Sequence, residues 1–146
     1  MPLENFVKKN VLTVSYDEAV SEIARLMRDN DVGAIVVCDE SGRPDGIITD
    51  RDIVLRCVAE NIDCNQATAR DVMTRQVETV PVSAGLIDVI ECMRSAEVRR
   101  VPLVDETGRA VALLSFGDVF EFLASELGSL AEPLTAAEKK LDEAAA

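Results

Sequence analysis

The sequence predicts an α/β fold of the α+β kind, built from two copies of one β-α-β-β-α unit. The chain has 146 residues, 48% of them hydrophobic, which suffices for a packed core without disulfides. A shift of 66 positions lays residues 13–57 onto residues 79–123 without a gap. Within each copy, apolar runs typical of strands alternate with apolar spacing typical of helices. The chain is therefore interpreted as a tandem repeat.

The repeat rests on identical residues at matching positions and on apolar residues between them. Ten of the 45 aligned pairs are identical. They are Thr13/Thr79, Val14/Val80, Met27/Met93, Arg28/Arg94, Val32/Val98, Asp39/Asp105, Glu40/Glu106, Gly42/Gly108, Arg43/Arg109 and Asp52/Asp118.

The first copy begins with a strand and a helix. Val11–Val14 is a short β-rich run, and Asp17–Asn30 carries apolar residues at helical spacing, with Arg25 and Arg28 late, as the helix dipole favours. The continuous apolar run Val32–Cys38 then predicts a buried strand.

A turn at residues 39–44 and a second strand, Gly46–Thr49, complete a hairpin. From Asp50 the pattern is helical again and ends near Asn61. The second copy repeats this order from Val77 to Leu127. We therefore expect repeat 1 at residues 5–61, a linker at 62–70, repeat 2 at 71–127 and a helical tail at 128–146.

The tail is predicted to be separated from the second repeat by Gly128 and Pro133, which interrupt helices. Thr135-x-x-Glu138 is a possible capping box for a last alanine-rich helix. Such a short helix is only marginally stable alone, so it is expected to pack against the rest of the chain or against a second subunit, or else to fray.

Composition and charge exclude several classes of function. The net charge of −12 repels polyphosphate backbones and anionic membranes, and 3% aromatic residues give little material for stacking bases. The chain has no His, which removes the commonest general base and most zinc chemistry. We expect no nucleic-acid partner and no membrane partner, and the lack of His counts against a catalytic role.

The four cysteines, Cys38, Cys57, Cys64 and Cys92, form no C-x-x-C pair. They are interpreted as reduced thiols that serve mainly as small buried hydrophobes. Because no apolar stretch is as long as a membrane span and the first residues lack a signal-peptide pattern, a cytoplasmic location is expected.

The strongest local signal is a strand that ends at a hydroxyl and continues into a helix with a carboxylate three residues later. It reads Gly46-Ile47-Ile48-Thr49-Asp50-Arg51-Asp52, with the echo Ala112-Leu113-Leu114-Ser115-Phe116-Gly117-Asp118. One interpretation is purely local, with Thr49 and Ser115 as helix caps and the Asp residues as partners in a capping box. Asp is shorter than the usual partner, which favours a second interpretation.

In the second interpretation the junction binds a nucleotide. A strand-to-helix junction aims free backbone N–H groups at an anion, and a hydroxyl such as that of Thr49 can donate to a phosphate oxygen. The carboxylate of Asp52 can accept from the 2′ and 3′ hydroxyls of a ribose. Arg51 and Arg99-Arg100 add positive charge, unless they are solvated residues paired with nearby acids.

The duplicated units, these two strings, Asp71-Val72-Met73-Thr74 and Arg99-Arg100-Val101-Pro102-Leu103-Val104-Asp105 resemble a pair of cystathionine β-synthase (CBS) domains, called a Bateman module. The resemblance covers about residues 5–127. It implies two units packed with pseudo-two-fold symmetry. It also implies a regulatory module that binds AMP, ADP, ATP or S-adenosylmethionine, often as a dimer, with no catalysis and no catalytic cofactor.

The resemblance further implies two clefts, each shared by both repeats. The first combines Thr49, Arg51 and Asp52 with Thr79, Val80, Arg100 and Pro102, and the second combines Ser115 and Asp118 with Thr13, Val14, Ala34 and Ile35. In the second cleft Ala112 replaces the usual Gly, Phe116 follows the serine, and Ala34 stands where the first has Arg100. We therefore expect the first cleft to bind more strongly.

Three rival functions remain at this point. The module can be a structural dimerisation or docking element with vestigial clefts, an enzyme, or a divalent-cation site on its acidic surface. A homodimer is predicted from the apolar helices after Thr49 and Ser115, and a regulated enzyme or transporter is the expected protein partner. The dimer prediction rests on Ile53, Val54, Cys57, Val119, Phe120, Phe122 and Leu123.

Overall fold

A computed structural model describes residues 3, 7 and 11–145, without the side chains of 130–139, 141–142 and 145. The predicted start of the first repeat, residue 5, lies outside the described residues. The chain divides into two compact units, Met1–Leu114 and Ser115–Ala146, which are described separately.

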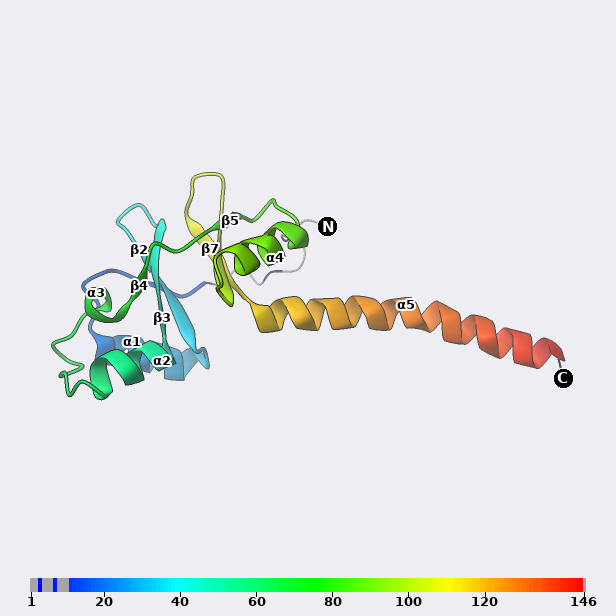
Figure 1. Ribbon diagram of the computed structural model, residues 1–146, viewed down its shortest axis with the longest axis horizontal. Helices are drawn as coiled ribbons and strands as arrows, with labels where there is room; N and C mark the ends of the chain where they lie inside the picture. Colours follow the sequence, from blue (N-terminus) through cyan, green and yellow to red (C-terminus); the bar gives the residue numbers. More distant parts are fainter. Residues whose placement is uncertain (1–2, 4–6, 8–10, 146) are drawn as a thin grey trace. The chain divides into compact units, whose positions relative to one another are not determined.

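The first unit contains a four-stranded sheet in the order β1-β2-β3-β4, of which β2, β3 and β4 are labelled in Figure 1. Its strands are β1 (Thr13–Val14), β2 (Ala34–Cys38), β3 (Pro44–Thr49) and β4 (Thr74–Arg75). β1 runs parallel to β2, whereas β3 is antiparallel to both β2 and β4. The edge strand β4 follows the predicted linker at residues 62–70, so residues beyond the predicted first repeat complete the first sheet.

Helices cover one face of this sheet and enclose the core (Figure 1). They are α1 (Val20–Asn30), α2 (Asp50–Ile53), the π-helical turn η2 (Val54–Val58) and α3 (Ala69–Val72). Their apolar side chains meet Ile35 and Val37 of β2 and Ile48 of β3, all fully buried. The helix predicted to reach Asn61 is therefore shorter, and its second half is π-helical.

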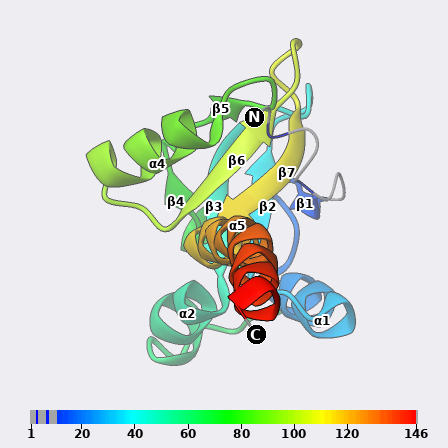
Figure 2. The same cartoon turned by 90° about the vertical axis from the view of Figure 1, so that its right-hand side faces the viewer.

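The second repeat forms a three-stranded sheet in the order β5-β6-β7, with α4 beside it (Figure 2). Its elements are β5 (Val80–Pro81), α4 (Leu86–Ser95), β6 (Arg100–Val104) and β7 (Ala110–Ser115). β5 runs parallel to β6, as β1 runs parallel to β2. The predicted order of strands and helices is confirmed in both copies.

The two hairpin turns explain why the string Asp-Glu-x-Gly-Arg occurs in both copies. In each turn the Asp carboxylate accepts from the backbone N–H groups two and four residues later, at 2.8–3.1 Å. Gly42 and Gly108 adopt positive φ angles of 81° and 83°, which side-chain-bearing residues rarely adopt. The turns also touch, since Ala110 N–H donates to the Gly42 carbonyl at 2.9 Å.

The second unit contains α5 (Phe116–Ala145), one helix of 30 residues. The predicted break at Gly128 and Pro133 is therefore wrong. Both residues have poor helix propensity, but Ala, Leu, Glu and Lys, which favour helices, follow them, and the φ angle of Pro is compatible with a helix. No helix within the described residues is long and apolar enough to cross a membrane. The division into repeats at 5–61 and 71–127 stays a prediction.

Both long helices of the first unit end at a residue with a left-handed backbone, Asp31 after α1 and Glu97 after α4, with φ angles of 53° and 54°. Glycine adopts this conformation without the steric penalty of a side chain. We expect Glu97→Gly to raise the free energy of unfolding by about 0.5–1 kcal/mol. Urea unfolding measures it, with Ser95→Gly inside α4 as the control that loses a similar amount. If the free energy of unfolding falls in both variants, the backbone at Glu97 is not strained.

Candidate functional site

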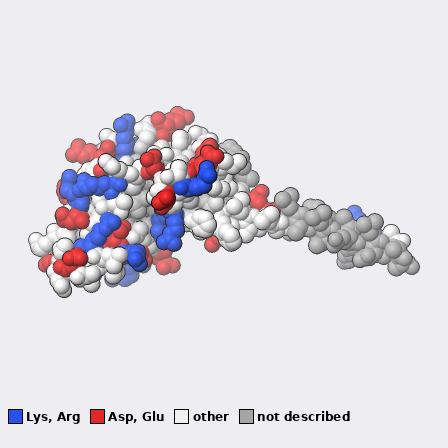
Figure 3. Space-filling view, viewed as in Figure 1, with Lys and Arg blue, Asp and Glu red and all other residues white. Residues whose placement is uncertain are grey.

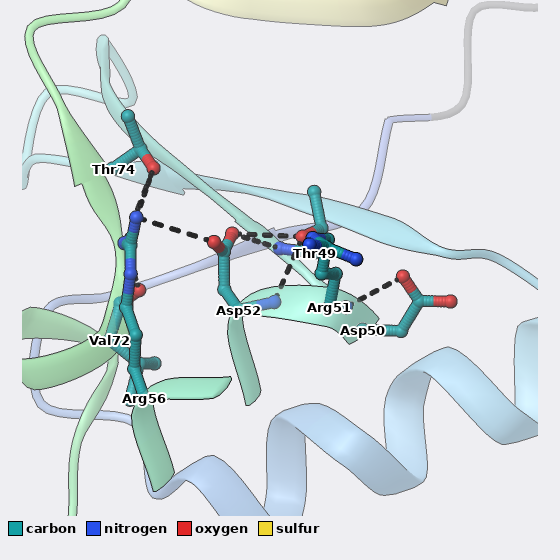
Figure 4. A network of polar contacts seen from close by, with 7 residues as sticks. All are labelled: Thr49, Asp50, Arg51, Asp52, Arg56, Val72 and Thr74. Atoms are coloured by element: carbon teal, nitrogen blue, oxygen red, sulfur yellow. Dashed lines mark hydrogen bonds and ion pairs between the residues drawn. The ribbon is translucent and has the colours of Figure 1, made fainter. Parts of the chain in front are cut away.

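The site predicted from the sequence begins at the junction between β3 and α2 (Figure 4). Asp52 Oδ2 accepts hydrogen bonds from the Thr49 backbone N–H at 2.8 Å and from the Thr49 hydroxyl at 2.9 Å. The Asp52 backbone N–H donates to Thr49 Oγ1 at 3.1 Å. This reciprocal arrangement is a capping box, and it fixes the carboxylate at the start of the helix.

The Asp side chain is long enough to close a capping box, so the prediction based on its short length is wrong. The carboxylate half of this arrangement recurs at Thr68/Asp71, Gly85/Asp88 and Ser115/Asp118, where an Asp carboxylate accepts from the backbone N–H three residues earlier at 2.7–2.8 Å. At Asp71 these hydrogen bonds, from the Thr68 backbone and hydroxyl, lower the pKa of the carboxyl below its usual value. A Thr-x-x-Asp or Ser-x-x-Asp string is therefore no sign of a ligand by itself.

Arg56 is a site residue that the sequence interpretation missed. Its guanidinium lies 3.5 Å from Asp52 Oδ1 and donates to the Val72 carbonyl at 2.8 Å and to the Thr74 hydroxyl at 3.3 Å (Figure 4). Arg56 thus joins the helix that carries Asp52 to the segment from α3 to β4. The spacing of four residues after Asp52 was the signal, because helical pairs at this spacing are neighbours.

Gly46 is packed closely and does not leave open space for a ligand. A methyl group added there meets Met73 Sδ at 2.8 Å and the Thr74 carbonyl oxygen at 3.0 Å. The absence of a side chain instead lets β4 approach β3, where Gly46 pairs with Arg75. The glycine acts on the site indirectly, because Thr74 is a partner of Arg56.

The remaining residues of the first predicted cleft lie in two groups. Arg51 is exposed at the start of α2, and its guanidinium has no hydrogen-bond or ion-pair partner among the described residues. Thr79 is exposed before β5, and Arg100 is half-buried at the start of β6, its guanidinium also without a described partner.

Val80 and Pro102, the apolar members of this cleft, are buried. In the part of the chain that the structure describes, no hydrogen bond or ion pair joins Thr49, Arg51 or Asp52 to Thr79, Val80, Arg100 or Pro102. The two groups therefore each have a defined local geometry without a direct polar contact between them.

The second predicted cleft divides between the two units. In the first unit, Thr13 and Val14 pair with Val36 and Val37 of β2, the strand that also carries Ala34 and the fully buried Ile35. In the second unit, Ser115 and Asp118 form a capping box at the start of α5. The Asp118 carboxylate has no described arginine partner, and the shift of 66 positions aligns Phe122 with Arg56.

Charges of both signs intermix on the face shown in Figure 3, despite the net charge of −12. No group of three or more His, Cys, Asp or Glu side chains suited to a metal ion occurs among the described residues. The described polar chemistry is therefore that of caps, turns and the Arg56 contacts.

We expect Arg56→Met to lower the free energy of unfolding by about 1–2 kcal/mol, because it removes a charged donor from the Val72 carbonyl and the Thr74 hydroxyl. Arg51→Met is the control, since its guanidinium has no described partner. Chemical denaturation of both variants measures the difference. Equal stabilities contradict a role for Arg56 in holding the junction.

The protein-family model that the chain matches and the known proteins similar to it point to the same domain family. Residues 3–58 and 69–125 match the model of the CBS domain. Hypoxic response protein 1 of Mycobacterium tuberculosis is 31% identical over 119 residues, 82% of each chain. The CBS domain-containing protein YhcV of Bacillus subtilis is 36% identical over 109 residues, 75% of this chain and 76% of that protein. The match to an uncharacterized protein of Methanopyrus kandleri, 32% identical, spans 58% of that protein's length.

Solved structures agree. The crystal structure of Hypoxic Response Protein I, with two coordinated zinc ions, aligns with a TM-score of 0.73 and 30% identity, covering 83% of this chain and 98% of that one. A putative signal-transduction protein with CBS domains from Burkholderia ambifaria aligns with a TM-score of 0.70 and 25% identity, covering 80% and 85%. With two matched segments that together span most of its length, the chain belongs to the CBS domain family and carries two CBS domains in tandem.

Proposed function

We propose that this CBS pair is a regulatory module that binds an adenine nucleotide, AMP, ADP or ATP, or S-adenosylmethionine. The observation that carries the proposal is a carboxylate held in place next in sequence to Arg51, a cation without a partner among the described residues. Asp52 is fixed by Thr49 and Arg56, while Arg51 and Arg100 have no described partner. A ribose needs an oriented acceptor for its hydroxyls, and a phosphate needs such cations.

The contacts of Thr49 and Asp52 support a more specific proposal for the roles within the cleft. The Thr49 hydroxyl donates to Asp52 Oδ2, so the phosphate role given to it from the sequence passes to Arg51 and Arg100. Among the described residues, Asp52 Oδ1 has only the Arg56 contact at 3.5 Å, which is longer than a charged hydrogen bond and leaves lone pairs for ribose hydroxyls. Thr79, Val80 and Pro102 form the opposite side, where the ligand bridges the two groups.

The fold itself supports an adenosyl ligand. A CBS domain pair that aligns with a TM-score of 0.73 and 24% identity was crystallised with 5′-methylthioadenosine and S-adenosyl-L-methionine. This likeness concerns the fold, which accommodates an adenosyl group in that protein. The identity of the ligand here depends on the residues of this chain.

We further propose a non-catalytic, cytoplasmic homodimer that regulates an enzyme or transporter. The structure changes the basis of the dimer prediction, because Ile53 and Cys57 lie in the core. The apolar surface for a dimer contact is instead formed in η2 by Val54, Leu55 and Val58, which are 47–58% exposed. A ligand regulates such a partner only through a difference in affinity between two conformations.

A thermal-shift screen of the purified chain against AMP, ADP, ATP, S-adenosylmethionine, NAD and GTP tests the proposal. A ligand at 100 times its dissociation constant that binds only the folded state adds about 2.7 kcal/mol of stability. We expect stabilisation by at least one adenosyl ligand and none by GTP. No stabilisation by any adenosyl ligand contradicts the proposal and favours the alternative, a structural dimerisation or docking module with vestigial clefts.

A further inference from the structure

Cys57 and Cys64 contact each other close in sequence to the proposed nucleotide site, which does not use either of them. Cys57 is in η2, and Cys64 is in the linker that follows. Their Sγ atoms are 2.7 Å apart, and the Ile62 carbonyl oxygen lies 3.4 Å from Cys57 Sγ and 4.0 Å from Cys64 Sγ. Both are free thiols.

The backbone holds this pair from two sides. The Ile62 N–H donates to the Cys57 carbonyl at 3.0 Å, closing the end of η2. The Ser21 N–H, at the start of α1, donates to the Cys64 carbonyl at 2.9 Å. A disulfide requires two sulfur atoms that can meet, and the contact between the two Sγ atoms brings this anchored pair together.

The two thiols differ in access. The Cys57 side chain is fully buried, whereas Cys64 is partly exposed. Burial, together with the Cys64 thiol and the Asp63 carboxylate, raises the pKa of Cys57 to about 11. Cys57 therefore stays protonated near neutral pH, and Cys64 is the thiol that a reagent in solution reaches first.

We propose that Cys57 and Cys64 form a thiol–disulfide exchange site for low-molecular-weight disulfides such as oxidised glutathione. The Cys64 thiolate attacks one sulfur of the small disulfide, which forms a mixed disulfide and releases one small thiol. The Cys57 thiol then loses its proton, and its sulfur attacks Cys64 Sγ, which releases the second small thiol. The two cysteines lose two electrons and two protons, and the small disulfide is reduced to two thiols.

The protein disulfide closes a loop from Cys57 to Cys64, which is the first part of the connection from η2 to α3. The Val72 carbonyl at the end of α3 and the Thr74 hydroxyl just after it are the partners of Arg56. The oxidation state of Cys57 and Cys64 therefore determines how freely the connection between η2 and α3 moves relative to the helix that carries Asp52. Amide hydrogen exchange in residues 59–67 is expected to slow on oxidation, because the closed loop opens less often.

Incubation of the fully reduced chain with oxidised glutathione tests the site. The wild type has four cysteines, and we expect two titratable thiols to disappear, with the mass of two hydrogen atoms lost and no glutathione retained. Proteolytic mapping is expected to show a Cys57–Cys64 link. Cys64→Ser should lose this reaction, whereas Cys92→Ser, a matched control at another partly buried cysteine, should keep it.

A stable glutathione adduct on Cys64 of the wild type overturns the proposal, because Cys57 then fails to complete the exchange. A link through Cys38 or Cys92, or between two chains, overturns it as well. Cys57→Ser is expected to retain one glutathione on Cys64, which separates the attacking thiol from the resolving thiol. These outcomes are independent of nucleotide binding, so the two proposals can fail separately.

Discussion

Asp52→Ala is expected to weaken adenine-nucleotide binding by roughly 10- to 150-fold. The variant loses hydrogen bonds between ribose hydroxyls and a charged acceptor, which contribute about 1.5–3 kcal/mol. The effect is expected to be large because Thr49 and Arg56 hold the carboxylate in one orientation before the ligand binds. Calorimetric titration of the wild type and the variant measures the loss.

Asp118→Ala is the matched control, since Asp118 closes the equivalent capping box but has no described arginine partner. It should change the tighter binding step much less than Asp52→Ala does. Each variant also loses a cap and about 1 kcal/mol of stability, which unfolding without ligand measures separately. Equal losses of affinity contradict the inequality of the clefts, and unchanged affinity in both leaves the carboxylates with a capping role alone.

Gly46→Ala is expected to lower the free energy of unfolding by about 1–3 kcal/mol, because the added methyl group overlaps Met73 Sδ and the Thr74 carbonyl. The side chain of Met73 can move, but the carbonyl belongs to the backbone of β4. The variant is therefore expected to push β4 from β3 and to loosen the Thr74 contact with Arg56. Urea unfolding gives the loss of stability.

Gly128→Ala is the control for the loss of a glycine, because a methyl group at Gly128 in α5 meets no described atom within 4 Å apart from the neighbouring backbone of its own helix. Alanine favours a helix more than glycine does, so this variant should gain up to about 1 kcal/mol. If Gly46→Ala is as stable as the wild type, β4 does not depend on close approach at Gly46.

Features repeated in the sequence were the most predictable part of the fold. The strands β2 and β3, the helices α1 and α4 and both hairpin turns follow from apolar spacing and from the string Asp-Glu-x-Gly-Arg. Each of these elements forms through contacts that are local or repeated 66 residues later, so the sequence contains the signal twice.

Features that depend on distant partners could not be predicted. β4 has two residues, too few for a pattern, and exists because Gly46 lets it pair with β3. The continuous α5 depends on its whole sequence rather than on Gly128 and Pro133. For the site, the sequence pointed to Thr49 and Asp52, but only the folded chain shows that Arg56 links them to Val72 and Thr74.

The contact between the two hairpin turns has a consequence for how this chain can change. A side chain added at Gly42 would meet the Arg109 guanidinium at 3.2 Å, and one added at Gly108 would meet Arg43 at 3.4 Å. Each turn therefore faces the image of itself, with the glycine of one copy beneath the arginine of the other. A side chain introduced at the glycine of either turn would therefore press on the arginine of the other turn, so the two turns do not tolerate substitutions independently. The repeat is most visible in the sequence where the two halves touch.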